Sequence, residues 1–190
     1  MYKIVKTPNP VLTTVAKPVA SFDKKLQKIL QDMEVTLLNT SDPIGVGLAA
    51  PQVDISLQIF LARPTENAPV LPFINPVIVS SSEIIKESTK KLSKKERREA
   101  EDKKILEGCL SMPNIWGHVT RSQKVVLTYQ DSTGKKHTTT FTGFMATIIQ
   151  HEVDHLNGIL FTKHVLSQRE KLYKSYKNKN GEEEFEEINL

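Results

Sequence analysis

The sequence predicts one domain of mixed helices and strands, organised around a helix that carries two histidines. Apolar residues recur at helical spacing over residues 21–40. Residues 124–130 and 135–142 alternate as strands on either side of a turn. Residues 150–155 read QHEVDH, an H-E-x-x-H pattern typical of a metal-binding helix. A chain of 190 residues can bury one proper core and is too short to expect two.

In the first half of the chain, Ser21 or Asp23 can cap a helix that runs to about Thr40, before Pro43. Residues 56–62 are predicted to form a buried strand. Residues 70–79 are predicted to form another strand, for which two prolines, at 72 and 76, imply an edge position or bulges. Residues 83–104 are charge-rich, and we expect an exposed insertion loop or helix there.

In the second half, the hairpin over 124–142 turns at residues 131–134. The histidine-bearing helix is predicted from about Gly143 to Leu156, with Asn157-Gly158 as its stop. Residues 166–176 are predicted to form a final helix. The acidic run at 182–187 is predicted to be frayed.

Composition limits the class of protein. No apolar run reaches the roughly 18 residues that cross a bilayer, and the first residues lack the apolar core of a secretory signal, so we expect no membrane contact. Cys109 is the single cysteine, which excludes a disulfide framework and favours a reducing compartment. The net charge of the chain is +4, and residues 86–104 alone contribute this amount, because they contain nine Lys or Arg and five Asp or Glu. Such clustering without aromatic residues argues against specific DNA binding.

The H-E-x-x-H pattern predicts a metal site. Residues four apart lie on the same face of a helix, so His151 and His155 can bind one ion, with Glu152 beside them as a general base. A catalytic site of this kind needs a third protein ligand. The candidates are Cys109, Asp154, His118, His137 and His164. Cys109 is favoured, because Asp154 points away from the shared face and the other histidines lie in no motif.

Three segments together resemble the motifs of the peptide deformylase family. They are GVGLAAPQ at 45–52, EGCLS at 107–111 and QHEVDHL at 150–156, in that family's order. Taken alone, residues 45–52 would be a tight turn before a strand. The resemblance implies an α+β fold, with antiparallel β-sheets packed around a central metal-binding helix and with N- and C-terminal helices. It also implies a catalytic domain over 1–166, interrupted by the 83–104 loop, and a C-terminal helix with an acidic tail over 167–190.

The resemblance further implies one divalent metal bound by Cys109, His151 and His155, with water as the fourth ligand. Fe2+ is the ion expected first, and Zn2+, Ni2+ or Co2+ can occupy such donors. The metal-bound water attacks the formyl carbon, with Glu152 as general base and then general acid. The Gln52 amide and the Leu110 backbone N–H are the implied oxyanion donors. The reaction removes the N-formyl group from the N-terminal methionine of newly made polypeptides and releases formate.

The implied substrate site has two parts. The segment 45–50 is an edge to which the substrate backbone adds as a short strand. The residues expected to bind substrate are Val46, Gly47, Gly108, Phe144 and Ile148, together with the ring carbons of His151. Glu107 and Arg121 form either a structural ion pair or two ordinary surface charges. Two departures from the family, Thr147 where Arg is frequent and Asn114 where Gly is frequent, concern the shape of the pocket.

The implied partner is the N-formyl-methionyl nascent peptide, and the bacterial cytoplasm is the expected location. Lys171, Lys174, Lys177 and Lys179 suggest ribosome contact through a basic helix over 169–179. Three other functions are open to the sequence. An H-E-x-x-H peptidase would use a His or Glu as third ligand, an inactive metal-binding homologue would have lost Glu152 or Gln52, and a nucleic-acid binder rests on charge alone.

Overall fold

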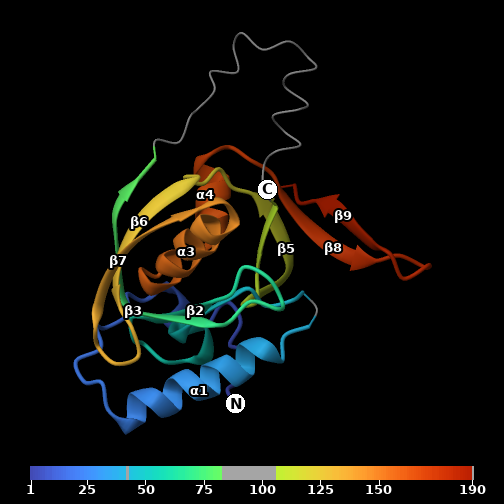
Figure 1. Cartoon of the computed structure of the whole chain (residues 1–190). Coiled ribbons are helices and arrows are strands. Elements are labelled where there is room, and N and C mark those ends of the chain that lie inside the picture. The colour runs from blue at the N-terminus through green and yellow to red at the C-terminus, as the bar shows by residue number, and fades with distance from the viewer. Residues whose placement is uncertain (42, 83–105, 190) are drawn as a thin grey trace.

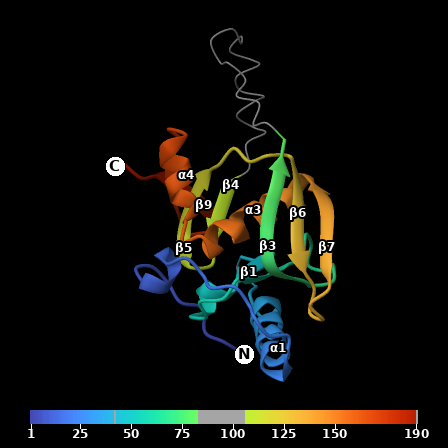
Figure 2. The same ribbon diagram turned by 90° about the vertical axis from the view of Figure 1, so that its left-hand side faces the viewer.

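The structure, a computed structural model, describes residues 1–41, 43–82 and 106–189. The predicted insertion at 83–104 therefore lies outside the described residues. Two antiparallel sheets lie on either side of the helix α3 (Gly143–Leu156), as Figures 1 and 2 show, so the predicted α+β class is confirmed. The remaining elements are η1 Pro10–Thr13, α1 Lys24–Leu38, β1 Gly47–Ala49, η2 Ala50–Val53, β2 Ile59–Ala62, β3 Leu71–Ser81, β4 Leu106–Cys109, β5 Met112–His118, β6 Lys124–Gln130, β7 Lys136–Thr142, α4 Phe161–Ser167, β8 Leu172–Lys177 and β9 Glu183–Glu187.

The first sheet has the strand order β1-β2-β3-β6-β7. The predicted hairpin is its outer pair, β6 and β7, joined by a turn in which Gly134 has a φ of 87°. The prediction of an edge position for residues 70–79 is wrong, because β3 lies between β2 and β6 in the middle of the sheet. The alternative of a bulge is correct, since the β3–β6 register shifts between Ile74 and Val77, beside Pro76.

The helix α1 begins as the sequence predicts. The Asp23 side chain accepts a hydrogen bond from the Leu26 N–H and caps the first turn. One face of the helix, including Met33 and Leu37, is fully buried and packs with residues of β1 and β2 in one apolar cluster. At 15 residues α1 is the longest described helix. Within the described part of the chain, no helix is long and apolar enough to cross a membrane.

The helix α3 has the predicted bounds. It starts at Gly143, whose φ is 59°, and it is followed by Gly158 at a φ of 67°, the left-handed position that glycine adopts without strain. Ala146, Ile149 and Leu156 pack into a second apolar cluster with residues of β2, β3 and β6. This packing fixes the rotation of α3, so that His151 lies beside Glu107 of β4 and Glu152 faces Gly47 of β1.

The prediction of a C-terminal helix over residues 166–176 is wrong. The helix α4 ends at Ser167, and Arg169 takes a left-handed φ of 59°. Residues 172–177 then form β8, which pairs with β5, and the acidic run predicted to be frayed forms β9. The second sheet thus has the order β4-β5-β8-β9. Lys-rich composition suits a helix, but the free edge of β5 offers strand pairing, and tertiary context overrides local propensity.

Candidate metal centre and active site

Three of the predicted ligand residues converge between α3 and the end of β4. One donor atom from each of Cys109, His151 and His155 lies within 4.8 Å of the others. The Cys109 Sγ is 3.2 Å from the His155 Nε2, and the two imidazole rings have centroids 5.0 Å apart. Among the described residues this is the one group of His, Cys, Asp or Glu that can hold a metal ion in this way.

The donor set suits a soft or borderline divalent ion. Burial alone would raise the pKa of the Cys109 thiol, but the neighbouring His155 and His151 outweigh it and hold that pKa well below its usual value. The His151 Nδ1 lies 3.1 Å from the Glu107 Oε2, and a carboxylate only accepts, so this nitrogen carries the proton. The His151 Nε2 is then the atom with a free lone pair, as metal ligation requires.

The other ligand candidates lie elsewhere. Asp154 points away from the shared face, as expected, and pairs with Arg121 and His164. His137 contacts Asp131 in the β6–β7 turn. His118 packs edge-on against Tyr173 of β8.

Glu152 is buried directly beside this group. Its side chain faces Gly47 of β1, where a Cβ would collide with the Glu152 Oε1, so only glycine leaves room for the carboxyl. The Glu152 Oε2 is buried and has no hydrogen-bond partner among the residues that the structure describes. Burial, the largest influence, raises the pKa of Glu152 to about 7. A carboxyl with a pKa near neutrality can accept a proton and return it under physiological conditions.

Gln52, which is buried in the short helix η2, has its amide held in place. The Ala49 N–H donates to the Gln52 Oε1 at 2.8 Å, which orients the amide nitrogen toward the centre. The Gln52 Nε2 donates to the Cys109 Sγ at 3.5 Å and to the Ser111 Oγ at 3.4 Å. The bond to the Ser111 Oγ is long and sulfur is a weak acceptor, so this N–H group can turn to a better acceptor at the site.

Glu107 and Arg121 form a buried ion pair, which resolves the alternative that the sequence left open. The Arg121 Nε and Nη2 donate to the two Glu107 oxygens at 2.8 and 2.9 Å, and the Arg121 Nη1 donates to the Asp154 Oδ2 at 2.6 Å. Burial would raise the pKa of Glu107, but the hydrogen bonds from Arg121 and His151 lower it to about 2. Asp154 extends this network, because its Oδ2 lies 2.9 Å from the His164 Nε2.

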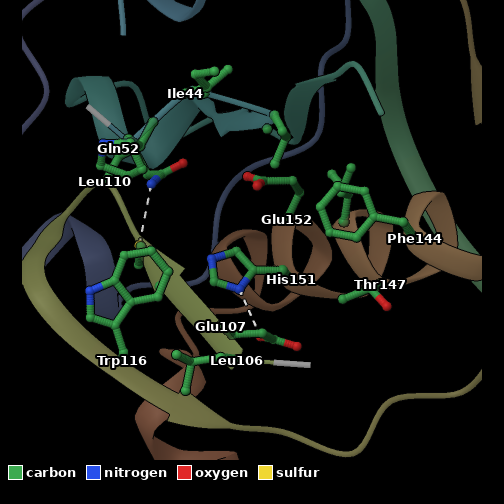
Figure 3. A pocket seen from close by; sticks show the side chains of 17 residues that line it. Ile44, Gln52, Leu106, Glu107, Leu110, Trp116, Phe144, Thr147, His151 and Glu152 are labelled. Atoms are coloured by element: carbon green, nitrogen blue, oxygen red, sulfur yellow. Dashed lines mark hydrogen bonds and ion pairs between the residues drawn. The ribbon is translucent and has the colours of Figure 1, made fainter. Parts of the chain in front are cut away.

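A cavity of about 230 Å³ opens beside Glu152 and His151 (Figure 3). The five predicted substrate-binding residues, as well as Gln52 and Leu110, all line it. Thr147, which the sequence associates with the shape of the pocket, lines it too, whereas the further lining residues Pro43, Ile44, Leu106 and Trp116 were not predicted from the sequence. A second cavity of about 350 Å³ borders the first, and both are lined by Pro43, Cys109, Leu110 and Trp116.

Comparison with known proteins gives one consistent result. The family model described as polypeptide deformylase matches residues 1–171. Peptide deformylase 1 of Bacillus cereus is 39% identical over 86% of this chain and 91% of its own length. The peptide deformylase of Brucella suis is 38% identical over 92% and 90%. The crystal structure of the enzyme from Thermotoga maritima superposes with a TM-score of 0.71 at 34% identity, covering 86% of this chain and 97% of the other.

Proposed function

This chain belongs to the polypeptide deformylase family and is therefore a hydrolase that removes the N-formyl group from nascent peptides. We propose that it uses a divalent metal held by Cys109, His151 and His155. We further propose that Glu152 is the group that moves the proton. The observation that carries the proposal is the convergence of the three donor atoms within 4.8 Å, beside a buried carboxyl oxygen that no group in the described part of the chain contacts by a hydrogen bond. This combination fits hydrolysis and has no evident structural purpose of its own.

The donor set of one thiolate and two imidazoles fits the metal. A divalent ion bound there would lower the pKa of a water molecule and polarise a carbonyl oxygen. Fe2+ is the ion we propose, by family resemblance, and Zn2+, Ni2+ and Co2+ accept the same donors. Glu107 supports the site from behind, because its hydrogen bond fixes the orientation and tautomer of His151.

Glu152 acts first as a general base and then as a general acid. Its free Oε2 takes the proton from the attacking water and delivers it to the nitrogen of the departing amine. The raised pKa of about 7 keeps both protonation states accessible near neutral pH. Gly47 contributes by leaving space for the carboxyl at this position.

Gln52 and Leu110 are the proposed donors to the developing oxyanion. The Gln52 amide is preoriented by its bond from the Ala49 N–H, so little reorganisation is needed when the charge forms. Leu110 follows Cys109 directly and lines the same cavity, and its backbone N–H is the second donor that we propose. A pair of fixed donors of this kind stabilises a tetrahedral intermediate by several kcal/mol, on the order of 3 for each donor.

The substrate enters as an added strand. Among the described strands, β1 is the outermost of its sheet and pairs only with β2, so its other edge is available to a peptide backbone. Val46, Phe144 and Ile148 give the cavity an apolar wall that suits a methionine side chain.

Newly made formyl-peptides arise in the bacterial cytoplasm, which is the location we propose. The basic helix through which a ribosome contact was predicted does not form, because residues 172–177 are a strand beside the acidic strand β9, and the contact itself stays a prediction. The Lys171 Nζ, for example, pairs with the Glu187 Oε2 at 2.6 Å.

The test is formate release from a formyl-Met peptide by protein purified without oxygen, with the metal content measured in the same sample. We expect rapid release with about one metal per chain and its loss on chelation. Cleavage of an internal peptide bond instead would favour the peptidase alternative. Metal without any hydrolysis would indicate an inactive homologue.

A further inference from the structure

Trp116 of β5 stands at the boundary between the two cavities and lines both. Its six-membered ring lies over Gly108 of β4, where a Cβ would come within 2.8 Å of the Trp116 Cε3. Figure 3 shows the ring edge turned toward the cavity and His151, with the indole nitrogen on the far side. The apolar part of the indole is therefore the part that a substrate meets.

Two residues of the C-terminal hairpin hold this ring. The Trp116 Nε1 donates to the Ser175 Oγ of β8 at 3.1 Å, and the Phe185 ring of β9 packs edge-on at a centroid distance of 5.9 Å. Ser175 and Phe185 are direct partners across the β8–β9 ladder, and Trp116 is the partner of Tyr173, two residues before Ser175. The side chains at 116, 175 and 185 thus share one face of the sheet.

The hairpin follows the last residue that the family model matches. That match ends at residue 171, and β8 begins at Leu172. A segment outside the family match thus touches a side chain inside the substrate cavity. Ser175 is buried, although its hydroxyl makes no contact with the metal-ligand group itself.

The path of the substrate brings it past Trp116. The formyl group has to lie beside Cys109 and Glu152, with the methionine side chain against the apolar wall of the first cavity. The peptide that follows the methionine must leave this cavity. The second cavity borders the first along Leu110 and Trp116 and extends toward Lys6 and Asn39 at the surface.

We propose that Trp116 is a specificity-determining residue that contacts the substrate residues after the formyl-methionine, and that Ser175 and Phe185 are positioning residues that set the orientation of its ring. The inference rests on the proposed function, since it concerns the same site. Because the indole N–H is already bonded to Ser175, the contact uses the ring surface, which favours an apolar or aromatic side chain in the substrate.

The test compares two substrates, formyl-Met methylamide, which ends at the methionine, and formyl-Met-Ala-Phe, which continues past it. Ser175→Ala and Phe185→Ala should each raise KM for the longer peptide by about three- to tenfold, leaving kcat and the shorter substrate nearly unchanged. Tyr176→Phe is the matched control, because it removes a hydrogen bond to Glu184 from the neighbouring position of the same hairpin.

A second readout does not depend on turnover. Trp116 is the one tryptophan of the chain, so tryptophan emission, excited selectively over the four tyrosines, reports this ring alone. We expect the emission of the parent protein to change on titration with the unformylated product Met-Ala-Phe and not with Met methylamide. Ser175→Ala should shift the emission and weaken the response to the tripeptide, whereas Tyr176→Phe should behave as the parent.

The outcomes separate the two proposals. If the parent releases formate from both substrates but the hairpin variants affect them equally, or the tripeptide leaves the emission unchanged, the inference about Trp116 is wrong and the proposed function stands. If the parent releases formate from neither substrate, the proposed function is wrong and the inference falls with it.

Discussion

Two ion pairs in this molecule each join a basic side chain to a glutamate, one in the interior and one at the surface. Glu107 and Arg121 lie behind the metal-ligand group with side chains only 5% and 6% exposed. Lys171 and Glu187 join the base of the C-terminal hairpin with side chains 61% and 42% exposed. The distances are similar, 2.8 and 2.6 Å, so the contact itself does not distinguish them. Burial does.

The difference teaches where charge matters in this fold. A buried pair has given up hydration, so removal of one partner leaves the other charge without compensation. An exposed pair is solvated and screened whether or not it forms. The buried group also has a second task, since Glu107 orients His151. The hairpin acts on the site through Trp116 and not through its charges.

The largest contrast should appear in activity. Glu152→Gln removes the proposed proton carrier and should lower kcat by about a hundred- to ten-thousandfold while the metal is retained. Glu184→Gln makes the same chemical change in the exposed hairpin and should leave formate release at the parental rate. Hydrolysis by the Glu152 variant within a few-fold of the parent would show that another group moves the proton.

The next contrast is in stability. Glu107→Ala leaves Arg121 buried beside Asp154 alone and should lower the free energy of unfolding by about 3–5 kcal/mol, measured by urea denaturation of metal-free protein. Glu107→Gln, which keeps a hydrogen-bonding side chain in the same volume, should lose less. Equal stability of the alanine variant and the parent would mean that water replaces the carboxylate at this position.

The pH dependence of stability sharpens the same contrast. The pKa of Glu107 is lowered to about 2, below its ordinary value of 4.5, so its carboxylate stabilises the folded state above about pH 4.5. This contribution should disappear as the pH falls from about 4.5 toward 2. In metal-free protein, the difference in unfolding free energy between the parent and Glu107→Gln should shrink over this range. A difference that stays constant down to pH 2 would assign the stabilisation to packing instead.

The two regions also differ in how far the sequence predicts them. His151, Glu152 and His155 are placed by the period of a single helix, so their convergence follows from local sequence. Cys109 is predicted as the third ligand because it carries the only thiol in the chain. The buried state of Glu107 could not be predicted in this way, because it depends on Arg121 and on a helix that lies far along the chain.

The prediction of a helix over residues 166–176, where the hairpin β8–β9 lies, failed for a physical reason. Residues 172–177 become a strand because β5 has a free edge, and β5 is more than 50 residues earlier in the sequence, at Met112–His118. The central position of β3 was missed for the same reason, since strand order is set by partners and not by the prolines at 72 and 76. The role of Trp116 in the cavity becomes visible only when β8 and β9 are placed against it.

The smallest effect should come from the exposed pair. Glu187→Ala removes the partner of Lys171, and the change in unfolding free energy should be below about 1 kcal/mol, because both groups remain solvated. That small effect should decrease further at high salt, since screening weakens the pair that the mutation removes. Formate release and the emission of Trp116 should stay as in the parent, because Glu187 pairs with Tyr173 and not with Ser175 across the hairpin. A loss of several kcal/mol, or a shift in Trp116 emission, would show that this ion pair helps to hold the hairpin on β5, and that burial alone does not separate the two regions.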